Sequence, residues 1–503
     1  MPLTHGIIAS PHHLASEAGA DVLRQGGNAM DAAVAADAVL CVVYPHMTSI
    51  GGDLFALIWP ADSDAPVGLA GGGRSGSLAT IAAVRAAGHE TMPQRGALTV
   101  TVPGTVEAWG RLIERYGSFG MQPLMAPAAR HARDGYLVTE HLASFLADNA
   151  GWLLREPEAR RLFPPVKAGM LLRNPDLADV LEEIGGNGFH GFYRGGVGAA
   201  IVAALERRGG HVTMDDLATH RSAWVEPVAF PYRNELTLYE MPPPTQGLCA
   251  AAMLRRFERL DHFDPGPRFA RELVRLRDEV YPLRDRFISD PDFTSVPWEP
   301  FLDPDHVATG AAAGSPPLPE GDTVYLCAAD EVGNVISLIQ SVSGSFGSGL
   351  IAEGTGVVLQ NRGAYFSLDP GHVNRLEPRK RTMHTLIPAM AGRANRCWGA
   401  FGAMGSDGQP QIQSQTFLNM VERGLSPAEA VAEPRLRVAP GGGGLWVEAD
   451  YCDAGEVARA ISGGQLMPPR SWQMGHAAAL VVDAPGRWRA GADPRSDGVV
   501  IEV

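Results

Sequence analysis

Two alternating runs past the middle of the chain constrain its fold more than any other feature. The runs TVYLCAAD and VISLIQS are separated by EVGN. Alternation with a period of two predicts β-strands, and a short connection containing Gly-Asn predicts a tight turn between them. The preceding segment, FLDPDHVATGAAAGSPPLPE (residues 301–320), is rich in residues that interrupt helices and strands. The sequence therefore predicts a linker that leads into a β-hairpin whose first residue is Thr323.

The hydroxyl of Thr323 has two interpretations. In the Gly-Asp-Thr step it can satisfy a turn, because Ser and Thr side chains commonly bond to nearby backbone. If the peptide bond before Thr323 is cut, the new α-amine lies beside the hydroxyl and can act as its general base. An acyl group attacked in this way also needs donors for its oxyanion, and the Gly-rich turn GAMGSDGQPQ (residues 402–411) offers backbone N–H groups. Taken alone, these residues leave both interpretations open.

The charge balance narrows the class of partner. Acidic residues number 56 against 42 Lys and Arg, a formal net charge of −14, so nucleic acid and anionic membranes are repelled on average. The start, MPLTHGIIASPHHLASEAGADVLRQGG, lacks a basic segment followed by a long apolar run, and no later stretch is apolar enough to span a membrane. We therefore expect a cytoplasmic protein with no nucleic-acid or membrane partner.

Cysteines and histidines give no indication of a metal site. The five cysteines are scattered without a CxxC pair, which favours reduced thiols over a disulfide framework or zinc site. The adjacent His12 and His13 lack the spacing that places two ligands on one helix face. We expect neither a metal nor another cofactor.

The remaining patterns indicate a chain of mixed helix and strand. Residues 16–45 have helical spacing interrupted by Gly-Gly-Asn, which predicts two packed helices. The run GGDLFALIWP alternates like a strand, and GLAGGGRSG (residues 68–76) is expected to be a Gly-rich loop. Helical patterns dominate residues 105–220 and 250–300, with strands expected between them.

Several motifs, in order along nearly the whole chain, resemble the γ-glutamyltranspeptidase family of N-terminal nucleophile hydrolases. They are GGNAMDAAVAADAVLCVVYP, GGDLF, GFYRGGVGAAIVAAL, GHVTMDDLATH, MPPPTQG, GDTVYLCAADEVGNVISLIQS, FGSG, LQNRGAYFS and GAMGSDGQPQ. The resemblance implies an α+β fold, a four-layer αββα sandwich, made from a precursor that cuts itself before the nucleophile. Here it implies cleavage between Asp322 and Thr323, giving a large subunit of residues 1–322 and a small subunit of residues 323–503 that form one intertwined body.

The resemblance also implies roles for individual residues. Thr323 matches the nucleophile, and Arg74 in GGGRSG matches an arginine that binds the substrate's α-carboxylate, for which a guanidinium fork is suited. Ser341 matches a hydroxyl that assists the nucleophile, and Ser343 stands where the family usually has a substrate-binding Asn. The remaining matched pair, expected to supply the oxyanion donors, is Gly405 and Ser406.

Other positions depart from the family pattern. Tyr365 stands where an acidic residue binds the free amine of a γ-glutamyl group, and Arg362 replaces a Gln. His384 and Thr385 replace a pair of serines, and Val324 follows the nucleophile where transpeptidases commonly have a second Thr. A pocket with Arg74 and Arg362 but no carboxylate for an amine should prefer an acyl group that carries an acid and lacks a nearby ammonium.

These departures make the chain similar to the oxamate amidohydrolase branch of the family, which hydrolyses a small carboxylate-bearing amide. Alternatives are a glutathione hydrolase or transpeptidase that recognises the amine through other residues, and an acylase for a larger carboxy-acyl amide. An uncleaved, non-catalytic binding relative is a further alternative from a different class. The sequence leaves open the amide, the balance of hydrolysis and transfer, and the oligomeric state, a homo-oligomer included.

Overall fold

The computed structural model describes the chain except for residues 1–4, 234, 261–262, 307–320 and 485. Most of the predicted linker therefore lies outside the described residues. Its first two residues belong to a short helix, α14 (Glu299–Leu302).

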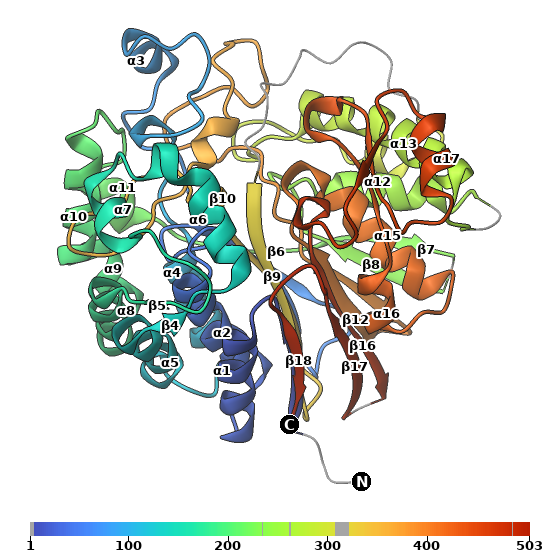
Figure 1. Cartoon of the computed structure of the whole chain (residues 1–503), viewed down its shortest axis with the longest axis horizontal. Helices are drawn as coiled ribbons and strands as arrows, with labels where there is room; N and C mark the ends of the chain where they lie inside the picture. Colours follow the sequence, from blue (N-terminus) through green and yellow to red (C-terminus); the bar gives the residue numbers. More distant parts are fainter. Residues whose placement is uncertain (1–4, 234, 261–262, 307–320, 485) are drawn as a thin grey trace.

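Two antiparallel sheets stacked face to face form the centre of the molecule (Figure 1). The first has the order β18-β1-β9-β10-β2-β3-β6 and the second β17-β16-β12-β11-β8-β7. The strands of the first sheet are β1 (Gly6–Ser10), β2 (Asp53–Trp59), β3 (Val67–Gly71), β6 (Ala223–Val225), β9 (Gly321–Asp330), β10 (Val335–Gly344) and β18 (Val499–Glu502). Those of the second are β7 (Val228–Tyr232), β8 (Leu236–Glu240), β11 (Ala389–Arg393), β12 (Arg396–Ala403), β16 (Ala477–Ala484) and β17 (Arg487–Ala492).

Helices cover the outer face of each sheet, so the predicted four-layer αββα sandwich is confirmed (Figure 1). The first sheet is covered by helices of the N-terminal half: α1 (His13–Arg24), α2 (Ala29–Val43), α4 (Thr105–Tyr116), α5 (Met121–Asp134), α6 (Glu140–Leu153), α8 (Pro175–Asn187), α9 (Phe189–Arg194) and α10 (Gly196–Glu206). The second is covered by α12 (Gly247–Phe257), α13 (Pro267–Phe287), α15 (Gln409–Val421), α16 (Pro427–Ala432) and α17 (Ala454–Ala460).

Smaller elements lie around these layers. The remaining helices are α3 (Ile81–Ala86), α7 (Pro157–Leu162) and α11 (Met214–Thr219), with 3₁₀ turns η1 (Ala97–Thr99), η2 (Arg362–Tyr365), η3 (Ser406–Gly408), η4 (Pro440–Gly442) and η5 (Trp472–Met474). The minor strands are β4 (Tyr136–Leu137), β5 (Leu171–Leu172), β13 (Leu436–Val438), β14 (Leu445–Glu448) and β15 (Gln465–Met467). None of the described helices combines the length and apolar character that a membrane span requires.

The two predicted N-terminal helices are confirmed as α1 and α2. Asn28 caps α2 by accepting hydrogen bonds from the N–H groups of Met30 and Asp31, and Asp31 accepts from the N–H of Asn28 in return. This reciprocal capping box explains why the chain restarts a helix after Gly-Gly. Every residue of α2 is buried, because the helix packs beneath the first sheet and is itself covered by other helices.

The predicted hairpin is confirmed as β9 and β10, with one correction. Strand β9 begins at Gly321 rather than Thr323, because Gly321 and Asp322 pair with Gly344 and Ser343 across the hairpin. The predicted strand at residues 51–60 is β2, whereas the expected Gly-rich loop begins later than predicted, since its first four residues belong to β3.

Alternation along β9 sets the direction of Thr323. Val324 and Leu326 pack against the helical layer, while Tyr325 and Cys327 pack between the two sheets. Successive side chains in a strand point to opposite faces, so Thr323 shares the inter-sheet face with Tyr325. The sandwich thus directs this hydroxyl toward the second sheet.

Candidate active site

Thr323 is buried and lies opposite a β-bulge in β10. Gln340 pairs with Val324 and Ser343 with Asp322, so Ser341 and Val342 together oppose Thr323. Bulges bend a strand locally and redirect its side chains, and they are frequent beside active sites. The fold therefore places the predicted nucleophile against the segment that carries both predicted β10 hydroxyls.

The bulge itself is held in an uncommon backbone conformation. Ser343 has φ of +80°, a region that residues other than Gly seldom adopt, and its N–H donates to the Ser341 Oγ at 2.7 Å. The Ser343 Oγ is buried and has no hydrogen-bond partner among the described residues. Ser343 is thus available to bond with a substrate.

The predicted oxyanion residues follow β12 and lie in a turn against β9. Gly405 has φ of +145°, and a Cβ there would lie 2.4 Å from the Cδ1 of Ile412, so the position requires glycine. Gln246 fixes this turn, because its Nε2 donates to the carbonyls of Ser406 and Thr385, both at 3.1 Å. The structure therefore brings a rigid, Gly-containing turn to the inter-sheet side of β9.

Arg362 is a buried cation with one unoccupied edge. It begins η2, its side chain is almost fully buried, and its Nη1 donates to the Thr385 Oγ1 at 3.1 Å. Its guanidinium lies over the ring of Tyr365, 5.0 Å from the centroid. The Nε and Nη2 atoms, which form the same edge of the guanidinium, have no hydrogen-bond partner among the described residues. Burial lowers the pKa of Arg362, and the nearby Tyr365 and Asp53 oppose that effect.

Tyr365 links Arg362 to the oxyanion turn. Its hydroxyl lies 3.2 Å from the Ser406 Oγ, within hydrogen-bonding distance. Three of the predicted site residues therefore form a chain of contacts, in which Tyr365 touches both Arg362 and Ser406. We call these three residues the wall of the site.

His384 and Asp53 form a buried pair near Arg362. The Nδ1 of His384 accepts from the N–H of Leu386, so its Nε2 carries the proton and donates to the Asp53 Oδ2 at 3.1 Å. Burial, with a smaller contribution from Arg362, lowers the pKa of His384 to about 4. The imidazole is thus neutral near neutral pH.

Asp53 was missed by the sequence reasoning as a site residue, although its motif, GGDLF, carried the family resemblance. Its Oδ1 accepts from the N–H of Gly73 and from the Nε2 of Gln360, in addition to the His384 contact at Oδ2. Both carboxylate oxygens are therefore occupied by protein donors. Gln246 was also missed, and only its place in MPPPTQG could have indicated it.

Arg74 differs from Arg362 in its electrostatic environment. It follows β3, and its guanidinium donates to the carboxylates of Asp290 and Asp292 and to the carbonyl of Arg379. The sequence reasoning gave the substrate carboxylate to Arg74, but two protein carboxylates already neutralise this side chain. The role of Arg74 therefore stays a prediction, and Arg362, by contrast, has no carboxylate partner among the described residues.

Comparisons with known proteins identify the family of the chain. The sequence model described as Gamma-glutamyltranspeptidase matches residues 15–503. The chain is 36% identical to the Glutathione hydrolase-like YwrD proenzyme of Bacillus subtilis, covering 99% of both chains. It is 34% identical to the Oxamate amidohydrolase proenzyme of Klebsiella pneumoniae, covering 98% of both.

A solved structure with the same layers extends the comparison. The cephalosporin acylase from Bacillus halodurans is 33% identical and superimposes with a TM-score of 0.90 over 99% of this chain and 96% of that one. The family match over almost the whole chain and the shared fold lead to one conclusion: this protein belongs to the γ-glutamyltranspeptidase family and is a hydrolase of amide bonds.

Proposed function

We propose that the chain cuts itself between Asp322 and Thr323 and then hydrolyses a small amide whose acyl group carries a carboxylate, with oxamate as the simplest example. The observation that carries this proposal is the unoccupied edge of the buried Arg362. Its Nε–H and Nη2–H point in the same direction, at the spacing of two carboxylate oxygens.

Energetics support a ligand at this edge. A buried charge is costly unless it is paired, and no carboxylate forms an ion pair with Arg362 in the part of the chain that the structure describes. The face of Tyr365 compensates part of the charge. A substrate carboxylate would supply the missing bidentate partner. Relief of the desolvation cost of Arg362 would then strengthen the binding of an acidic acyl group.

The proposed reaction uses residues already placed around Thr323. After cleavage, the α-amine of Thr323 takes the proton of its own hydroxyl, and the Oγ attacks the amide carbonyl. Backbone N–H groups of Gly405 and Ser406 stabilise the oxyanion, the amine leaves with the proton, and an ester of Thr323 remains. Water then attacks this acyl-enzyme, releasing the diacid and restoring the hydroxyl.

Glutathione is disfavoured by the same wall. Its γ-glutamyl group carries an ammonium that needs an acidic partner, and Tyr365 offers only a phenol, which lies against Ser406. The nearby Asp53 carboxylate already accepts three hydrogen bonds from the protein. An unpaired ammonium next to the Arg362 cation would be repelled.

An acylase for a larger carboxy-acyl amide is a second candidate, favoured by the cephalosporin acylase relative at 33% identity. Arg362 would bind the distal carboxylate of such an acyl group as it would that of oxamate. The two candidate functions predict different acyl-chain lengths for the best substrate. Because Arg362 and Thr323 lie at one fixed separation, only one chain length can place the carboxylate at Arg362 and the amide carbonyl at Thr323.

The first test is the intact mass of the purified protein and of Thr323→Ala under denaturing conditions. Two polypeptides dividing at Asp322 and Thr323, absent from the variant, are expected. The mature protein is then given oxamate, longer dicarboxylic monoamides and glutathione, and release of ammonia or glutamate is measured. Hydrolysis of oxamate or its longer analogues without glutathione hydrolysis supports the proposal. A chain that stays single, or one that prefers glutathione, refutes it.

A further inference from the structure

A cavity of about 340 Å³ beside the hairpin is not used by the acyl group in the proposed reaction. Its lining comes from α6, η5, the segment after β10 and the segments flanking η1 and η2: Gln94, Arg95, Phe145, Asp148, Asn149, Ser345, Asn361, Trp472 and Gln473. We infer that this cavity receives the leaving amine, and that among amides of the same small carboxylate-bearing acyl group the enzyme prefers those whose amine carries an aromatic ring. This inference rests on the proposed function.

The cavity adjoins the cleavage point. Gly344 pairs with Gly321, two residues before Thr323, and the next residue, Ser345, lines the cavity. Asn361, which also lines it, accepts a hydrogen bond from the N–H of Gly344 at 2.8 Å. The cavity wall and the strand that opposes Thr323 are therefore one continuous, hydrogen-bonded segment.

The same wall separates the cavity from the carboxylate receptor. Asn361 lines the cavity, whereas the next residue, Arg362, is almost fully buried and does not. An acyl group whose carboxylate reaches Arg362 is thus directed away from the cavity. The substituent on the amide nitrogen is the part of the substrate left to occupy it.

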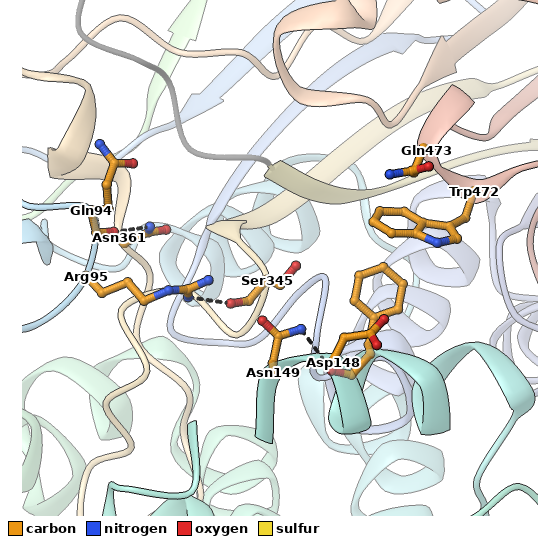
Figure 2. A pocket seen from close by; sticks show the side chains of 9 residues that line it. Gln94, Arg95, Asp148, Asn149, Ser345, Asn361, Trp472 and Gln473 are labelled. Carbon is orange, nitrogen blue, oxygen red and sulfur yellow. Dashed lines mark hydrogen bonds between the residues drawn. The ribbon is translucent and has the colours of Figure 1, made fainter. Parts of the chain in front are cut away.

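The cavity lining combines an aromatic surface with one basic and one acidic side chain. Phe145 and Trp472 pack with their ring centroids 4.6 Å apart, which provides a broad apolar surface. Figure 2 shows Trp472 on one side of the cavity and Arg95 and Asn361 on the other. Arg95 is held by the carbonyls of Ser345 and Gly347, and its charge is opposed across the cavity by Asp148.

The cavity is much larger than ammonia, the amine that oxamate releases. A ring with one or two carbon atoms attached fits within this volume with room to spare, whereas an unsubstituted amide leaves the cavity to water. Burying such a ring against Phe145 and Trp472 strengthens binding through removal of apolar area from water. Selectivity between amides of the same acid should therefore come from Trp472 and its neighbours rather than from Arg362.

The test compares N-benzyl oxamate with N-methyl oxamate, because the two leaving amines are alkylamines that differ mainly in bulk. For the self-processed wild type, kcat/KM should be higher for the benzyl amide. Trp472→Ala should lower kcat/KM about tenfold for the benzyl amide and leave the methyl amide unchanged. Trp298→Ala, which removes a partly exposed tryptophan outside the cavity lining, is the matched control and should change neither.

A second variant guards against misfolding in the first. Asp148 is exposed, so Asp148→Trp should fold and fill the cavity, and it should reduce benzyl turnover alone. Equal turnover of the two amides by the wild type, or equal losses in both variants, overturns the inference while oxamate hydrolysis leaves the proposed function standing. If no oxamic amide is hydrolysed, the proposed function fails and the inference fails with it.

Discussion

Replacing Arg362 by glutamine should lower activity without lowering stability, because under the proposed function the free edge of this buried cation serves a ligand rather than the fold. The variant restores the residue expected at this position from the family pattern. It keeps a side chain that can donate to the Thr385 Oγ1, the partner that Arg362 Nη1 has now. The change removes the Nε and Nη2 donors, which have no partner among the described residues.

The loss of activity follows from those two donors. A hydrogen bond to a charged group contributes about 1.5–3 kcal/mol, so two to one carboxylate amount to about 3–6 kcal/mol. Arg362→Gln should therefore lower kcat/KM for oxamate by about two to four orders of magnitude, measured as ammonia release. Arg362→Lys, which keeps the charge without the fork, should lose less.

The stability of Arg362→Gln should rise although its activity falls. Removing a buried charge without a carboxylate partner relieves its desolvation, and we expect the free energy of unfolding to rise by about 1–2 kcal/mol. Arg495 is the matched control, because it is equally buried but paired with Glu448 and Asp493. Arg495→Gln leaves the buried Glu448 without its cation, while Asp493 keeps its ion pair with Arg435, and the change should cost about 3–5 kcal/mol.

Chemical denaturation of both variants, together with the kinetic assay, tests whether Arg362 serves a ligand or the fold. If Arg362→Gln loses stability as Arg495→Gln does and retains oxamate turnover within about threefold, Arg362 is a structural residue and the reasoning is refuted.

Three further predictions concern the surrounding wall. Tyr365→Asp should place a carboxylate beside the Arg362 guanidinium, now 5.0 Å above the Tyr365 ring, and should lower kcat/KM for oxamate about 100-fold; unchanged kinetics would contradict this. Gln246→Ala leaves the buried carbonyls of Ser406 and Thr385 without their donor, so stability should fall by about 1–3 kcal/mol and kcat for oxamate should fall more than KM rises. The third is the pH dependence of unfolding: since the pKa of His384 is about 4 in the folded chain against an ordinary 6.5, the unfolded state binds more protons between these values. The stability that the neutral His384 contributes is therefore complete above about pH 6.5 and is lost as pH falls, by about 2 kcal/mol at pH 5. When the free energy of unfolding is measured by urea denaturation at a series of pH values, it should depend less steeply on pH in His384→Asn than in the wild type.

The hairpin and the helical layers could be predicted because their signals are local. Alternation in β9 and β10 and the cap at Asn28 are each contained within a few neighbouring residues. The bulge at Ser341 could not, because it depends on which residues of β9 lie opposite. The state of Arg74 depends on Asp290, 216 residues away, and no local pattern carries that information.

The residues at positions 362 and 365 are best understood as one substitution rather than two. An acidic side chain at 365 beside Arg362 would form an ion pair, neutralising the guanidinium and occupying the edge that now has no partner. A glutamine at 362 beside Tyr365 would leave the wall with no charge of either sign and hence no group to select an ionic acyl substrate. Only the combination of Arg362 with a neutral aromatic residue gives a buried cation that is supported by a ring face and still open to an anion. The Tyr365 hydroxyl also reaches Ser406, so the same side chain that supports Arg362 positions the turn expected to hold the oxyanion. Under the proposed function, recognition of the acid and stabilisation of the oxyanion are coupled through Tyr365, and in this chain a change of substrate class should require both positions to change together.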